Sequence, residues 1–218
     1  MSKVLLAITN HSQMLGGGEH SFLDLISSLP ERWRPLVSAN DEGSLLTQLR
    51  GRSIQVAIAK MPPIRPWRLF QILGSIKGYC NLCLKHKVAI IYANGSRAAF
   101  YGGIAGRILK IPVVWHCRIA ERDPLLDSIL CRLSNFIISN SVATSRRFPE
   151  RFKKKTRVIY NGIDIKFLKD NVGFPTQVEA KKSWNILVAA RVSKLKGHDL
   201  AIKAFEKSVS VFSSRSYA

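Results

Sequence analysis

The sequence lacks long hydrophobic runs, a secretory leader and a cysteine framework. Its longest apolar stretches are interrupted by Arg107, Lys110 and Arg118, which excludes a membrane-spanning helix there. The N-terminal apolar run, Val4–Thr9, is too short for a secretory signal, and no small-residue cleavage pattern follows it. The spacing of the four cysteines is not that of a disulfide-rich domain. With 46% apolar residues and a mean hydropathy of +0.03, the chain is expected to be globular and cytoplasmic.

Acidic residues are scarce. Lys and Arg number 34 and Asp and Glu number 14, which gives a formal net charge of +20. The charge is densest in residues 146–157, where seven of twelve side chains are cationic. Such a run is typical of a solvated helix face and loop, of a surface that contacts an anionic membrane, or of a nucleic-acid surface. No aromatic stacking pattern or helix-turn-helix signature accompanies the run, so nucleic acid is not an expected partner.

Short strand-like runs alternate with amphipathic segments along most of the chain. This order predicts an α/β fold with a doubly wound, Rossmann-like parallel sheet over residues 1–160. The predicted strands are Val4–Thr9, Pro35–Ala39, Gln55–Ala59, Ala89–Ala93, Pro112–His116, Phe136–Ser139 and Arg157–Tyr160. The predicted helices are Gly18–Leu29, Ser44–Arg50, Trp67–Lys85, Arg97–Leu109, Pro124–Leu133 and Ser141–Phe148.

The alternating pattern stops after Tyr160 and resumes near the end of the chain. Residues 161–184 are polar and contain Gly173 and Pro175, which predicts a hinge. Residues 185–218 contain an apolar run, Asn185–Ala190, and an amphipathic segment after His198. We expect these to be the first strand and helix of a second Rossmann-like domain.

A metal site is not expected. Cys80, Cys83 and His86 have ligand-like spacing, but all three fall in one predicted helix and no second ligand pair is visible. A covalent nucleophile is not expected either, because neither a serine-histidine-acid order nor a nucleophile elbow occurs.

Three glycines join the first strand to the first helix. Gly17 and Gly18, preceded by Gly16, would let a ligand approach the backbone and the N-terminus of that helix closely. Ligands in open α/β sheets bind at the carboxyl ends of strands. The dinucleotide fingerprint is incomplete because Ser21 stands where it requires glycine. Asp41 and Glu42 follow the second strand, where a ribose-binding acid would lie, so a nucleotide-dependent oxidoreductase remains an alternative.

His116 ends the fifth predicted strand and should therefore lie at the same edge of the sheet. A histidine there can position a hydroxyl or stabilise charge, and it can equally be a packed strand-end residue. Arg118 and the charged residues 121–123 follow it. They could line the same crevice or pair with one another at the surface.

A diphosphate site is predicted near the end of the chain. Arg191, Lys194 and Lys196 lie in a loop after an apolar run, and Gly197 opens a helix. Long cations beside a helix N-terminus suit a diphosphate, because the free backbone N–H groups and the helix dipole add to the side-chain charge.

Together these motifs resemble the family 4 glycosyltransferases of the GT-B fold. They follow the order seen in that family, and the last two are the most specific. The matching segments are Gly16–Leu25, the strand-end His116, Ile137–Ala143, Val158–Asp164 and Val188–Leu200.

The resemblance implies transfer of a sugar from a nucleotide-sugar donor to a sugar or lipid-linked acceptor, with retention of configuration and without a metal or other cofactor. Arg191 and Lys196 correspond to the pair that holds the donor diphosphate. Gly17 and Gly18 correspond to the loop that closes over the donor, and His116 to the histidine that contacts the transferred sugar.

The family's second domain continues with further strands and a pair of glutamates that this sequence does not contain. The chain as written is therefore expected to be truncated early in the donor domain and inactive alone. An anionic membrane surface is an expected partner, with the protein peripheral on the inner face of the cytoplasmic membrane. Besides an oxidoreductase, a non-catalytic basic module that binds membranes or nucleic acid remains an alternative.

Overall fold

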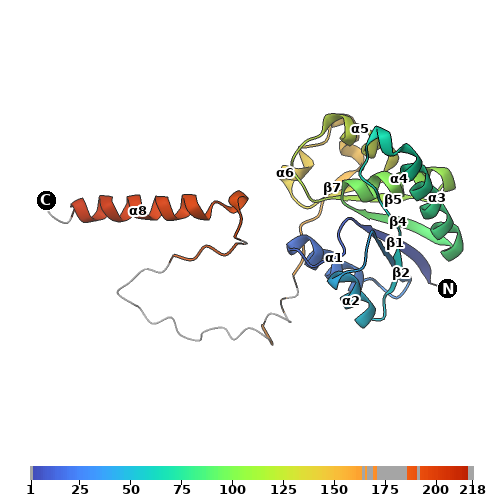
Figure 1. The fold of residues 1–218 in the computed structure, drawn as a ribbon, viewed down its shortest axis with the longest axis horizontal. Coiled ribbons are helices and arrows are strands. Elements are labelled where there is room, and N and C mark those ends of the chain that lie inside the picture. Colours follow the sequence, from blue (N-terminus) through green and yellow to red (C-terminus); the bar gives the residue numbers. More distant parts are fainter. Residues whose placement is uncertain (1, 164, 166–168, 171–185, 191, 216–218) are drawn as a thin grey trace. The chain divides into compact units, whose positions relative to one another are not determined.

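The computed structural model describes residues 2–163, 165, 169–170, 186–190 and 192–215. The chain divides into two compact units, Met1–Ile165 and Lys166–Ala218 (Figure 1). The boundary falls within the predicted hinge, most of which lies outside the described residues.

The first unit is built on a seven-stranded sheet with the order β3-β2-β1-β4-β5-β6-β7. Every neighbouring pair of strands is parallel, which confirms the predicted doubly wound sheet. The strands are β1 (Lys3–Thr9), β2 (Trp33–Ala39), β3 (Gln55–Ile58), β4 (Val88–Asn94), β5 (Val113–Cys117), β6 (Phe136–Ser139) and β7 (Thr156–Val158). The helices are α1 (Gly17–Ser27), α2 (Ser44–Gly51), the 3₁₀ turn η1 (Pro66–Arg68), α3 (Leu69–His86), α4 (Ser96–Leu109), α5 (Pro124–Leu133), α6 (Val142–Ser145) and the 3₁₀ helix η2 (Glu150–Lys155).

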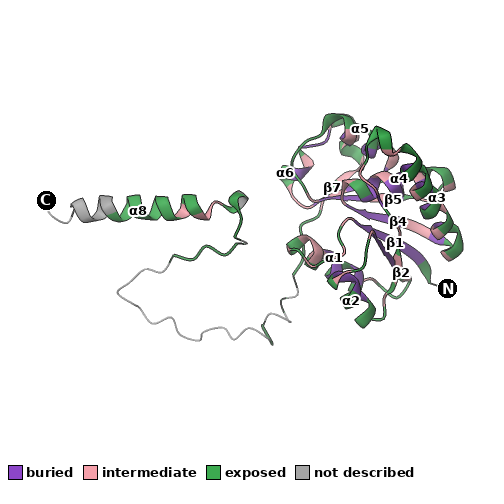
Figure 2. Ribbon diagram, viewed as in Figure 1, coloured by how far each residue is buried: buried purple, intermediate pink, exposed green. Residues whose placement is uncertain are grey.

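Helices cover both faces of the sheet (Figure 1). Side chains alternate between the faces along β1: Leu6 and Ile8 belong to a core formed with α3, α4 and α5, whereas Leu5 and Ala7 belong to a core formed with α1 and α2. The central strands are therefore buried on both sides, and they read as continuous apolar runs in the sequence (Figure 2).

The sixth predicted helix is much shorter than expected. Ser141 caps it by accepting a hydrogen bond from the Thr144 N–H at 3.1 Å, but α6 ends at Ser145. Pro149 disfavours helical geometry at the residue before it, so the chain turns there and continues as η2. The predicted seventh strand begins one residue earlier and ends two residues earlier than expected.

Several cations of the basic run are engaged in the fold. Arg147 is buried against Asp127, with its Nε 2.9 Å from Oδ2 and 3.0 Å from Oδ1. Lys155 donates to the carbonyl oxygens of Ser134, at 2.6 Å, and Cys131. Lys153 pairs with Glu150. Arg147 and Lys155 therefore join the segment after α6 and the end of η2 to α5 and its C-cap residue Ser134.

The second unit contains the 3₁₀ turn η3 (Lys194–Lys196) and the helix α8 (His198–Arg215). The helix expected after His198 is confirmed. The strand expected over Asn185–Ala190 is not, because residues 186–190 have no strand geometry and Asn185 lies outside the described residues. A strand requires a neighbour to satisfy its backbone N–H and C=O groups, and the described part of this unit offers none.

Candidate active site

Polar residues gather at the carboxyl edge of the first unit's sheet, where parallel strands all end. Asn10, just after β1, accepts a hydrogen bond from the Ala98 N–H at 2.9 Å and so joins β1 to the start of α4. Gly95 between β4 and α4 has φ +103°, and a Cβ there would lie 2.6 Å from Asn10 Nδ2. Glycine is therefore required at this position. The close approach of the Gly95 backbone to Asn10 helps to fix the carboxyl end of β1 against the start of α4.

His116 near the end of β5 is 6% exposed. Its Nδ1 lies 2.5 Å from the hydroxyl of Tyr92 on β4, and the two rings meet edge to face with centroids 5.9 Å apart. Its Nε2 is buried without a hydrogen-bond partner among the described residues. Burial, with a contribution from the Arg118 charge, lowers the pKa of His116 to about 3, so the imidazole is neutral at physiological pH.

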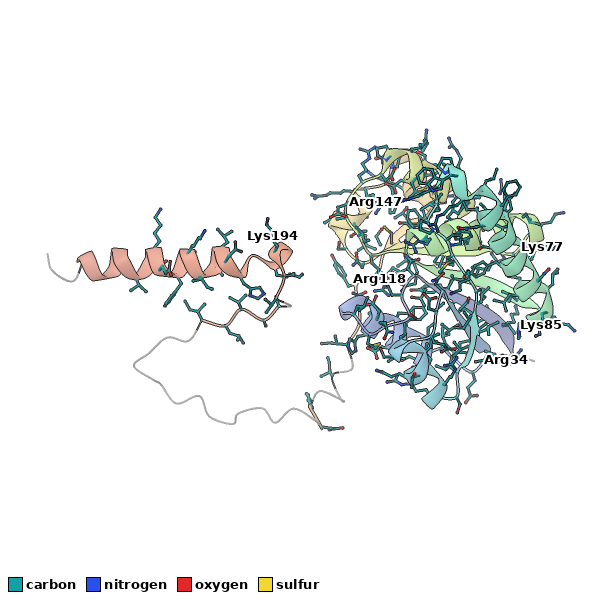
Figure 3. All side chains as sticks on the ribbon, viewed as in Figure 1. Arg34, Lys77, Lys85, Arg118, Arg147 and Lys194 are labelled. Carbon is teal, nitrogen blue, oxygen red and sulfur yellow. The ribbon has the colours of Figure 1, made fainter. Side chains whose placement is uncertain are left out.

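Arg118 holds several elements together at this edge (Figure 3). Its Nε donates to Asn94 Oδ1 at 2.7 Å, and its Nη1 donates to Ser21 Oγ at 3.2 Å and to Asn161 Oδ1 at 2.9 Å. Its Nη2 is buried and has no partner within the described parts of the chain. Of the two roles left open by the sequence, the structure supports the first for Arg118, because its partners are residues at the carboxyl edge of the sheet. We call Tyr92, Asn94, His116 and Arg118 the carboxyl-edge cluster.

The two candidate glycines lie beside this cluster. Helix α1 begins at Gly17, and no side chain caps its N-terminus. A Cβ on Gly18 would lie 3.9 Å from Arg118 Cδ, whereas a Cβ on Gly17 would meet no atom within 4 Å. The space over Gly17 is thus open. The N–H groups of Glu19 and His20 donate to the Gly16 carbonyl oxygen, which leaves those of Gly17 and Gly18 as the candidates to bind a ligand.

The structure brings His116, Gly17 and Gly18 together in the first unit. Lys196 belongs to the second unit, where it is exposed at the end of η3 and is followed by Gly197 with φ +64° and by α8. Arg191 lies outside the described residues. Lys196 therefore lies just before a helix N-terminus, whereas its role at a diphosphate site and its pairing with Arg191 stay predictions.

The acids considered for ribose binding have other partners. Asp41 Oδ1 lies 2.6 Å from Lys60 Nζ, and Glu42 Oε2 lies 2.7 Å from Arg50 Nη1. Cys80 and Cys83 lie in α3 as predicted, and burial raises the pKa of the Cys83 thiol to about 12. Within the described residues, no three His, Cys, Asp or Glu side chains form a group that could hold a metal ion.

A second feature of the same edge is a pocket of about 710 Å³ beyond β2 and β3. Lys60, Arg68 and Arg97 contribute cationic groups to its lining. Gly74 and Gly78, one turn apart on α3, also line it, and a Cβ on either would meet nothing within 4 Å. The pocket therefore combines cationic side chains with a stretch of α3 backbone that carries no side chains at Gly74 and Gly78.

The buried neutral His116 makes stability depend on pH in a defined window. An unfolded histidine titrates near 6.5, so between pH 6.5 and about 3 the unfolded chain binds a proton that the folded chain does not. The free energy of unfolding should fall as pH drops through this window, by up to about 1.4 kcal/mol per pH unit, and His116 should add no pH dependence above it.

Urea denaturation between about pH 7 and 5 measures this slope above the range in which most carboxylates titrate. In His116→Gln the slope should be shallower by about 1 kcal/mol per pH unit. Identical slopes in the two proteins would show that folding does not lower the pKa of His116.

The profile of glycosyltransferase family 4 matches residues 15–167. The Anabaena protein Alr3699/HepE, solved in complex with UDP, is 25% identical over 75% of this chain and 45% of its own, with a TM-score of 0.60. A glycosyltransferase from Rickettsia africae is 17% identical, with a TM-score of 0.66 and coverage of 80% and 47%, respectively. MurG from Acinetobacter baumannii is 20% identical, with a TM-score of 0.53 and coverage of 68% and 43%.

The last two similarities support the fold alone. The chain spans less than half the length of each of these proteins. No curated protein matches its sequence. Because the profile matches well over half of the 218 residues, the chain belongs to glycosyltransferase family 4.

Proposed function

We propose that the first unit is the acceptor-side domain of a retaining glycosyltransferase and that residues 185–218 begin its donor-side domain. The donor in this proposal is a UDP-sugar. Support comes from Alr3699/HepE, which has been solved with UDP and with UDP-glucose. In the reaction, the bond between the anomeric carbon and the diphosphate breaks and its electron pair leaves with UDP. An acceptor oxygen bonds to the same carbon from the same face, and the proton of the acceptor hydroxyl passes to the departing diphosphate.

The observation that carries this function is the buried, neutral His116 with an unpartnered Nε2. Burial raises the pKa of the Tyr92 phenol to about 12, so its hydroxyl keeps its hydrogen. The phenol hydroxyl lies within hydrogen-bonding distance of His116 Nδ1. The neighbouring Arg118 guanidinium acts on the pKa of the phenol but cannot accept a hydrogen bond from it. We therefore infer that the hydroxyl donates to Nδ1. The ring hydrogen then sits on Nε2 and can be donated to a hydroxyl of the transferred sugar.

The departing diphosphate requires positive charge, which this chain can supply without a metal. In the first unit, the candidates are the unpartnered Nη2 of Arg118 and the open N-terminus of α1 at Gly17 and Gly18. In the second unit, they are Arg191 and Lys196. Preorganised donors of this kind stabilise developing negative charge in a transition state.

The pocket beyond β2 and β3 is our candidate for the acceptor site. It lies at the same edge of the sheet as the carboxyl-edge cluster, and its volume suits a small ligand. Lys60 is paired with Asp41, while Arg68 and Arg97 offer guanidinium groups that suit an anionic or hydroxyl-rich acceptor.

Gly78→Leu tests this assignment. Leucine has a higher helix propensity than glycine, and a Cβ at this position would meet no atom within 4 Å, so the fold should be retained. In a form of the protein with its donor-side domain completed, transfer of labelled sugar from UDP-sugars to saccharide and lipid-linked acceptors would be measured. We expect at least about a tenfold rise in the KM for acceptor, because the new side chain occupies the pocket.

Asn81→Leu is the matched control. It adds the same side chain at an exposed position of α3 that does not line the pocket. An unchanged acceptor KM in Gly78→Leu, or equal rises in both variants, would place the acceptor elsewhere.

A further inference from the structure

Large apolar side chains project into solvent where α3 begins. Phe70 is 88% exposed and Trp67 is 73% exposed, and Leu69 and Leu73 are more than half exposed. We call these four residues the α3 apolar face. Much of the surface of α3 is exposed, although its other side lies against the core (Figure 2).

These side chains are not required to pack the helix. The core-facing side of α3 is already apolar, with Ile72, Ile76, Tyr79 and Cys83 buried. A second apolar surface that faces solvent lowers the solubility of the protein and does not contribute to the stability of the fold. Contiguous exposed apolar surface of this kind marks an interaction site.

The charge around the face is of one sign. Residues 43–120 contain twelve Lys and Arg and no Asp or Glu. Arg65, Arg68 and Lys77 belong to the segment that carries the face, and the Arg65 guanidinium lies 5.3 Å from the centre of the Trp67 ring. Figure 3 labels Lys77 and Lys85 along α3. The partner must therefore accept apolar side chains and carry negative charge.

We propose that the α3 apolar face inserts into an anionic lipid leaflet, with Arg65 and Lys77 at the headgroups. Tryptophan favours the boundary between headgroups and acyl chains, and arginine and lysine can bury their stems while their charges stay in water. A second copy of the chain is disfavoured, because a symmetric contact would bring cations against cations. No helix among the described residues is long and apolar enough to cross a membrane.

This surface differs from the basic run at 146–157. In that run, Arg147 and Lys155 are engaged in the fold, and β7, which begins within the run, is the outermost strand at the opposite end of the strand order from β3. Arg68 and Gly74 also line the candidate acceptor pocket. Docking through α3 would hold that pocket beside the lipid surface. The docking itself does not depend on sugar transfer.

Co-sedimentation of the 218-residue protein with vesicles tests the proposal. Vesicles of phosphatidylglycerol and phosphatidylcholine should bind it at least about tenfold more tightly than phosphatidylcholine alone, and salt should weaken this binding. Phe70→Ser combined with Leu73→Ser should reduce binding by at least about tenfold. The matched control is Leu125→Ser, which replaces a leucine 76% exposed on α5 and should change nothing.

Charge variants separate the two basic surfaces. Arg65→Gln with Lys77→Gln should weaken binding to anionic vesicles more than Lys153→Gln with Lys154→Gln. Brominated lipids should quench tryptophan fluorescence in the wild type, and this quenching should be reduced in Trp67→Phe, which keeps an apolar ring at the position.

Several outcomes would overturn the proposal. These are absence of binding to anionic vesicles, equal binding to neutral vesicles, and equal losses in the α3 and α5 variants. Dimerisation abolished by Phe70→Ser and Leu73→Ser would instead identify a second copy as the occupant. Binding of single-stranded RNA that requires Trp67 and Phe70, without vesicle binding, would identify a nucleic-acid surface.

Discussion

Replacing Arg147 with alanine is expected to lower the free energy of unfolding by about 3–5 kcal/mol. Arg147 and Asp127 are 6% and 1% exposed, and each is the other's charge partner in the interior. Arg147 also donates to the Ile119 carbonyl oxygen at 2.9 Å and lies 5.8 Å from the centre of the Trp115 ring. Removing the guanidinium would leave a buried carboxylate without its counter-charge, which is among the most destabilising changes in a protein core.

Urea denaturation measures this effect, and the double variant Arg147→Met with Asp127→Leu is its control. Replacing both charges with apolar side chains leaves no uncompensated charge, so the double variant should be more stable than Arg147→Ala. A double variant that is less stable than Arg147→Ala would contradict this explanation. It would show that the attraction between the two charges stabilises the protein more than apolar side chains in their place.

Much of the fold was predictable because a parallel sheet covered on both faces leaves a strong pattern. Strands such as β1 and β4 are buried on both sides and appear as continuous apolar runs between amphipathic helices. The same topology places the carboxyl ends of all the strands at one edge of the sheet. A polar residue at a strand end, such as His116, could therefore be assigned to the crevice without coordinates.

Partnerships between distant residues could not be predicted. Nothing in the local sequence distinguishes Arg147 from Arg146. Arg147 is nevertheless buried against a carboxylate 20 residues earlier in the chain, whereas Arg146 is exposed. Tyr92 reads as an ordinary strand residue, and its contact with His116 depends on the β4–β5 register. Arg118 and Asn94 follow strand ends, and that position was the one available signal for them.

The pocket and the α3 apolar face were also missed, for a different reason. Helical periodicity predicted the helix α3 but gave no role to the residues on its exposed sides. Gly74 and Gly78 look like weak helix formers in the sequence, whereas in the structure they line open space. The expected strand at 185–190 shows the opposite error, since an apolar run predicts strand character but cannot supply the neighbouring strand that it needs.

His116→Ala is expected to lower kcat for sugar transfer by about a hundredfold, as loss of one preorganised donor to a transition state does. The expected loss follows from the site's geometry: Nε2 has no partner among the described residues, so a sugar hydroxyl that reaches it gains a fixed donor. Tyr92→Phe keeps the ring but removes the hydroxyl that sets the tautomer. It should lower kcat by about tenfold.

His11→Ala is the control, because His11 is an exposed histidine in the loop after β1 at the same edge of the sheet. The decisive measurement is kcat for transfer from a UDP-sugar by the four proteins, each with the donor-side domain completed and each shown to be folded. The account predicts a loss of about a hundredfold in His116→Ala, a smaller loss in Tyr92→Phe and wild-type turnover in His11→Ala. Wild-type turnover in His116→Ala would contradict the assignment of the carboxyl edge as the site of sugar transfer.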